Sequence, residues 1–149
     1  MIEILIQIIF GWIYSHMLEN ILHRISHQKG FSLKIYKGHY LRHHLTAKIN
    51  KMKDRSLEDI RGRTARFEIS FLIILGAIHL PILITAPYAY AIIVASGIEY
   101  FIIHRKIHSD TLWGRIHYPH HYEHHINDDN DNWGIRRTWP NKIINLFLN

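Results

Sequence analysis

The chain has 149 residues, enough for one domain, and it lacks cysteine, so disulfide frameworks and thiolate metal sites are excluded. The formal charge of +6 would by itself suggest a nucleic-acid partner or an anionic membrane surface. Such an average misleads, because basic and apolar residues occupy separate stretches of the chain. The unusual component is histidine, the commonest metal ligand in proteins, with 14 copies.

The first predicted element is a membrane-spanning helix at residues 2–22. This stretch has no Lys or Arg, and at about 1.5 Å per residue it is as long as a bilayer's hydrocarbon core is thick. It lacks the basic start and the small-residue cleavage site of a signal peptide. We therefore expect a span that is retained.

A second apolar region, residues 67–103, is about twice as long as a single span and also lacks Lys and Arg. Pro81 and Pro87 lie near its middle and favour a helix, a tight turn and another helix. We predict spans near 67–85 and 88–108.

The basic residues predict the topology. All 18 Lys and Arg lie in residues 23–66 or after residue 103, and with three spans these stretches fall on the same side of the membrane. The positive-inside rule makes that side cytosolic and places the amino terminus outside. The expected fold is all-α: one membrane-embedded helical domain, residues 1–149, with 23–66 and 109–149 forming a cytosolic helical cap. A nucleic-acid partner is not expected, because no known binding motif is present.

Histidines recur at helical spacing on the predicted cytosolic side. His23 and His27 end the first span, and His104 and His108 end the third. Residues four apart share a helix face, so each pair points two imidazoles at one place. Further histidines follow in the two cytosolic stretches: His39, His43, His44, His117, His120, His121, His124 and His125. Spacing and topology together predict a metal site rich in histidine.

Two carboxylates precede the histidine pairs inside the spans. Glu19 lies before His23-Arg24-x-x-His27, and Glu99 lies before His104-Arg105-x-x-His108. A carboxylate in a membrane is costly unless it has a partner. We expect Glu19 and Glu99 to accept hydrogen bonds from ligand imidazoles or to bind metal directly.

The last histidine motif carries the most specific pattern, His121-x-x-His124-His125 followed by Asn132-Trp133-Gly134 and Trp139. Together with the Glu19–His27 motif, it resembles the membrane-bound fatty acid hydroxylase and sterol desaturase superfamily of histidine-box di-iron oxygenases. The middle motif, His39-x-x-x-His43-His44, is one residue longer than the family pattern. It leaves open whether His39 pairs with His43 or with His44.

The resemblance implies two iron ions as cofactors, with O₂ as co-substrate. Redox-inert zinc cannot hydroxylate a C–H bond, although imidazole sites bind zinc well and purified samples can contain it. The expected metal ligands are His23, His27, His39, His43, His44, His104, His108, His117, His121, His124 and His125.

The expected function is hydroxylation of a long-chain lipid, most simply a fatty-acyl or sphingolipid chain. Electrons would come from a separate cytochrome b5-like or ferredoxin-like donor, in a bacterial inner membrane or the endoplasmic reticulum. A carotenoid hydroxylase and a sterol desaturase or oxidase remain alternatives, as does a non-catalytic membrane protein that binds metal.

Two histidines lie inside the spans. We expect His79, far from the other histidines, to have a structural or interfacial role. His16 lies on the same helix face as His23, where it would line a substrate channel or form a hydrogen bond within the bundle.

Overall fold

The computed structural model describes residues 1–128 and 130–148, except for the side chain of residue 148. The described part is helical and has no β-strand, which confirms the predicted all-α class. In chain order the helices are α1 (Ile2–Ser26), α2 (Leu33–Gly38), the π-helix η1 (His39–His44), α3 (Leu45–Ile49), α4 (Arg55–Glu58), α5 (Arg63–Ile78), α6 (Leu80–Thr85), α7 (Pro87–Ser109), α8 (Thr111–His117), α9 (Pro119–Ile126) and α10 (Trp139–Leu148).

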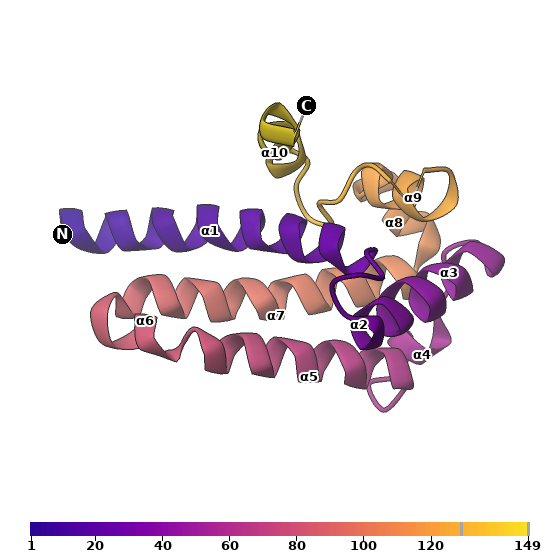
Figure 1. Cartoon of the computed structure of the whole chain (residues 1–149), viewed down its shortest axis with the longest axis horizontal. Coiled ribbons are helices and arrows are strands. Elements are labelled where there is room, and N and C mark those ends of the chain that lie inside the picture. Colours follow the sequence, from indigo (N-terminus) through magenta and orange to yellow (C-terminus); the bar gives the residue numbers. More distant parts are fainter. Residues whose placement is uncertain (129, 149) are drawn as a thin grey trace.

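Three long helices, α1, α5 and α7, lie side by side, and the short helices α2–α4, α8 and α9 gather at one end of them (Figure 1). Helix α7 packs against both α1 and α5. Gly11 lets α1 approach α7 closely, because a Cβ there would lie 2.8 Å from the carbonyl oxygen of Ala89. Helices α1 and α7 run in the same direction, so their carboxyl ends meet beside the short helices.

The expected helix over 67–85 is broken into α5 and α6 at His79. Proline at position 81 cannot donate a backbone hydrogen bond, and its ring clashes with the carbonyl four residues earlier, so the helix cannot continue through it. Pro87 then provides the fixed φ at the start of α7. The predicted helix over 67–85 is thus two helices, and the chain turns at Ala86 between α6 and α7.

One described helix, α1, has the length and apolar composition to cross a membrane by itself. Of the other two long helices, α5 has 16 residues and α7 has 23. The long helices nevertheless expose many large apolar side chains, such as Ile6, Ile73 and Ile102.

Side chains that cap helix ends position the short helices. Asp54 accepts from the backbone N–H of Ser56 at the start of α4, and Asp110 accepts from that of Trp113 at the start of α8. Pro119 starts α9 directly afterwards. The chain turns sharply at these helix starts. As a result, α8 packs against α7, and α9 packs against α8.

Helix α10 was not predicted from the sequence. It contacts α1 through the stacked indoles of Trp139 and Trp12, whose centroids lie 5.8 Å apart. Arg24 also donates to the side-chain oxygens of Asn141 and Asn145.

Candidate metal centre

Most of the chain's histidines meet where the long helices end. They come from the carboxyl ends of α1 and α7, from η1 and from α9, and all are buried except the half-buried His27. Every expected ligand except His117 belongs to this cluster: His23, His27, His39, His43, His44, His104, His108, His121, His124 and His125.

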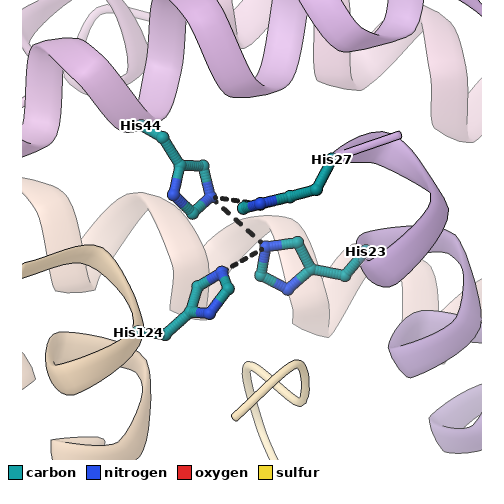
Figure 2. A group of neighbouring side chains, drawn as sticks. All are labelled: His23, His27, His44 and His124. Carbon is teal, nitrogen blue, oxygen red and sulfur yellow. Dashed lines mark hydrogen bonds between the residues drawn. The ribbon is translucent and has the colours of Figure 1, made fainter. Parts of the chain in front are cut away.

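A first group consists of His23, His27, His44 and His124, whose ligand nitrogens all lie within 4.8 Å of one another. The four rings converge on one point from three elements (Figure 2). Nε2 of His44 lies 3.1 Å from Nε2 of His27 and 3.4 Å from that of His23. Nε2 of His124 lies 3.2 Å from that of His23, and His39 places its Nε2 3.2 Å from that of His44.

A second group consists of His43, His104, His108 and His125, again with all ligand nitrogens within 4.8 Å. Nε2 of His43 lies 3.2 Å from Nε2 of His104. His121 adjoins this group, because its Nε2 lies 3.4 Å from that of His108.

The two groups are adjacent. The rings of His44 and His125, one from each group, stack with centroids 3.8 Å apart. His43 and His44 are neighbours in sequence, yet each belongs to a different group. The arrangement is therefore that of two neighbouring sites that could each hold a metal ion.

The π-helix η1 explains the unusual spacing of the middle motif. A π-helical turn contains an extra residue, so side chains five apart in sequence come together. His39 accordingly contacts His44, and His43 turns toward the second group. The middle motif is one residue longer than the family pattern, and the wider π-helical turn accommodates that residue while keeping His39 beside His44.

Hydrogen bonds on the outer side of the rings fix their tautomers. Three Nδ1 atoms donate to backbone carbonyls: His23 to Trp133 (2.7 Å), His108 to Met52 (2.6 Å) and His124 to Asp131 (2.5 Å). A carbonyl oxygen only accepts, so Nδ1 carries the proton and Nε2 keeps its lone pair. The Nε2 lone pairs of these rings therefore face the cluster interior, as metal ligands require.

Two observations fit a bound cation. Burial, reinforced by neighbouring imidazoles, lowers the pKa of His39, His44, His121 and His125 well below the ordinary value, so additional protons are disfavoured between facing lone pairs. Among the described residues, neither ring nitrogen of the buried His125 has a hydrogen-bond partner. A metal ion satisfies both conditions.

The spacing of the nitrogens also fits. Two ligand nitrogens at the usual 2.0–2.1 Å from one metal ion lie about 2.9–3.4 Å apart for tetrahedral or octahedral angles. The close Nε2 pairs of both groups lie 3.1–3.4 Å apart. Small movements of the rings suffice to complete such a site.

Two carboxylates that the sequence reasoning missed support the second group. Asp54 accepts from Nδ1 of His43 at 2.9 Å, and the carboxylate of Glu68 lies 3.1 Å from Nδ1 of His104. The sequence could have indicated Glu68, because a carboxylate inside an apolar stretch needs a partner, as Glu19 does. It could not have indicated Asp54, which lies in a polar loop among many other polar residues.

The expectation for Glu19 and Glu99 needs correction, because both carboxylates bind Arg136. Glu19 accepts from Nε of Arg136 at 2.6 Å and from the backbone N–H groups of Ile135 and Arg136. Glu99 accepts from Nη1 of Arg136 at 2.7 Å. The cost of burying the Glu19 carboxylate is thus offset by a guanidinium from the C-terminal segment.

That segment, residues 131–137, covers the first group. The Trp133 ring packs on His27 and His124, with centroids 4.8 and 5.1 Å away. Gly134 is required for the tight path, since a Cβ there would collide with the carbonyl oxygen of Arg137. The segment supplies the carbonyls for His23 and His124 as well as the arginine for Glu19.

The remaining histidines lie outside the cluster. His117 is exposed and packs on Trp113, which corrects its assignment as a ligand. His120 donates to the backbone carbonyl of Ile135 at 2.9 Å. His16 is buried edge-on against Trp12 and away from the cavity lining, and its two nitrogens have no hydrogen-bond partner among the described residues.

An apolar cavity of about 590 Å³ lies between α1, α5 and α7. At one end it is lined by His23 of the first group, by the adjoining His39 and by Glu68. At the other end it is lined by His79 and Tyr90. The cavity thus leads from the histidine cluster along the long helices.

No protein-family model, curated protein or solved structure matches this chain. The assignment of a function therefore depends on the chemistry of the site.

Proposed function

We propose that this protein is a membrane-bound, non-haem di-iron oxygenase that hydroxylates a long-chain lipid with O₂ and electrons from a separate donor. The observation that carries the proposal is the pair of adjacent histidine groups at one end of an apolar cavity. Imidazole donors with fixed tautomers suit two metal ions, and the cavity suits a hydrocarbon substrate.

The distribution of side chains supports a three-span arrangement. Soluble proteins rarely expose large continuous apolar surfaces, whereas α1, α5 and α7 expose Ile6, Ile73, Ile102 and many similar residues. Lys and Arg are absent from residues 2–22 and 67–103, so a bilayer can surround those stretches. The histidine cluster then lies near the cytosolic headgroup level.

Iron bound at these groups would supply the redox chemistry for oxidising a C–H bond, which zinc cannot. The protein's own part is to orient the ligands and to exclude water. Carbonyls and carboxylates hold the rings of His23, His43, His104 and His108 in place. The Trp133 ring covers the first group, and apolar side chains line the approach for substrate.

The position of the cavity supports a lipid substrate. Because His23 and His39 line its inner end, a hydrocarbon chain lying in the cavity brings one carbon close to the first group. The cavity lies between helices that we place in the bilayer, so a lipid can enter sideways without crossing water. Oxidation near the polar end of the lipid follows from the headgroup level of the cluster.

The test is metal analysis of protein purified without oxygen from iron-replete cells, followed by mass spectrometry of the host's lipids. About two iron ions per chain and lipids that gain one oxygen atom are the expected results. Oxygen found only on carotenoid rings or sterols would replace the fatty-acyl assignment. Stoichiometric metal with no oxidised lipid, in the presence of a working donor, would indicate a non-catalytic metal-binding protein.

A further inference from the structure

The cavity ends at a polar contact between two helices. Tyr14 on α1 places its hydroxyl 2.7 Å from Nε2 of His79, which follows α5. Nδ1 of His79 donates to the carbonyl of Leu75 at 2.7 Å, so Nε2 is the acceptor and the tyrosine donates. Both nitrogens of the buried His79 are therefore held, and its ring is fixed in position.

This contact links α1 to the carboxyl end of α5. Helix α7 packs on both of them, and the cavity lies between the three. His79 itself lines the cavity, and the ring of Tyr14 lies edge-on against it with centroids 5.5 Å apart. His79 thus lines the cavity at the end opposite the histidine cluster, and Tyr14 holds its ring there.

The distance between the two ends corresponds to a defined chain length. Helix α5 rises about 17 Å from Glu68 to His79, and α1 rises about 14 Å from Tyr14 to His23, at about 1.5 Å per residue. An extended hydrocarbon with C–C bonds of about 1.5 Å advances roughly 1.25 Å per carbon. About 11 to 13 carbons therefore fit between the pair and the cluster.

We propose that the Tyr14–His79 pair is the stop that selects the length of the substrate's hydrocarbon chain. The inference rests on the proposed function, since it takes the occupant of the cavity to be the chain of the lipid substrate. Under it, His79 determines specificity at the far end of the cavity while taking no part in metal binding. This role goes beyond the structural or interfacial one that the sequence predicts for His79.

The test uses metal-loaded, detergent-solubilised protein and a series of straight-chain primary alcohols of about 8 to 20 carbons, which brackets the length of the cavity. Native mass spectrometry measures which alcohols remain bound. His79→Ala opens the stop, and His79→Phe keeps a ring there without the hydrogen bonds. Tyr88→Ala removes an exposed tyrosine near the same end, outside the cavity lining, and serves as the matched control.

The wild-type protein should prefer a definite length, and His79→Ala should shift the preference upward by about three carbons, the reach of the lost ring. His79→Phe and Tyr88→Ala should keep the wild-type length, and all four proteins should keep their metal. An identical length preference in His79→Ala would overturn the stop and leave the proposed function standing. Metal-loaded wild-type protein that binds none of the alcohols would overturn both the stop and the lipid substrate.

Discussion

At the scale of single residues, the outer hydrogen bonds of the imidazoles decide what the site can bind. His43 donates to Asp54, and although burial opposes ionisation of this carboxylate, the hydrogen bond from His43 holds its pKa at about 2. Asp54 is thus ionised at neutral pH and raises the basicity of the ring that faces the second group. The ligand and its carboxylate act together.

Replacing Asp54 by Asn should weaken metal binding at the second group about 10- to 100-fold, because the negative charge behind His43 is lost. Titration against a competing chelator measures the affinity. Asp54 also caps α4 through Ser56, so Ser56→Ala controls for a loss of local structure and should leave the affinity close to wild type. Equal affinities in Asp54→Asn and the wild-type protein would contradict this role.

His124→Ala should remove about half of the bound metal, because only the first group contains this residue. Elemental analysis of the purified protein measures it. His117→Ala is the matched control, since His117 is exposed on the neighbouring helix α8 and should leave the metal content unchanged. Similar losses in the two variants would mean that the buried cluster is not the metal site.

At the scale of elements, the π-helix η1 assigns adjacent residues to different sites. Its wide turn aligns His39 with His44 and turns His43 toward His104. Helix α9 achieves a similar division with ordinary α geometry, sending His124 to the first group and His125 to the second.

The C-terminal segment depends on a buried ion pair. Arg136 and Glu19 are almost completely buried, so replacing the arginine by Met leaves an uncompensated carboxylate. We expect Arg136→Met to lower the free energy of unfolding by about 3–5 kcal/mol, and the double variant with Glu19→Gln to recover most of that loss. Unfolding in mixed micelles measures both. Arg137→Met, at an exposed neighbour, should change little, and a double variant no more stable than Arg136→Met would argue against the pairing.

At the scale of the whole molecule, the parallel course of α1 and α7 brings both of their histidine pairs to one end. Helix α5 runs back along the other side of α7 and contributes Glu68 at that same end (Figure 1). The buried histidine cluster thus lies at one end of the three long helices, and exposed apolar side chains such as Ile6, Ile73 and Ile102 lie along the helices themselves.

The absence of cysteine allows a direct test of topology. Single cysteines at Gly30, where added atoms meet open space, and at Tyr88, which is 47 % exposed, mark the two ends of the bundle. A membrane-impermeant maleimide should label Gly30→Cys only from the cytosolic side and Tyr88→Cys only from the opposite side. Labelling of both from one side would rule out the three-span arrangement.

Local sequence patterns determined the helical class of this protein and the pairing of its histidines along single helices. The helical class follows from the apolar stretches, and the pairing of His23 with His27 and of His104 with His108 follows from helical spacing. The segregation of basic residues also predicted one common end for all of these histidines. Each of these features depends on residues that are close in sequence, so the sequence alone determined them.

Only the tertiary structure decided which groups meet across the chain. Glu68 reaches His104, Arg136 reaches Glu19, and Tyr14 reaches His79, each over dozens of residues. The register of η1 likewise depends on its packing, because the same six residues satisfy an α-helix locally. Such contacts follow from how helices pack in three dimensions, and neither periodicity nor charge along the chain specifies that packing.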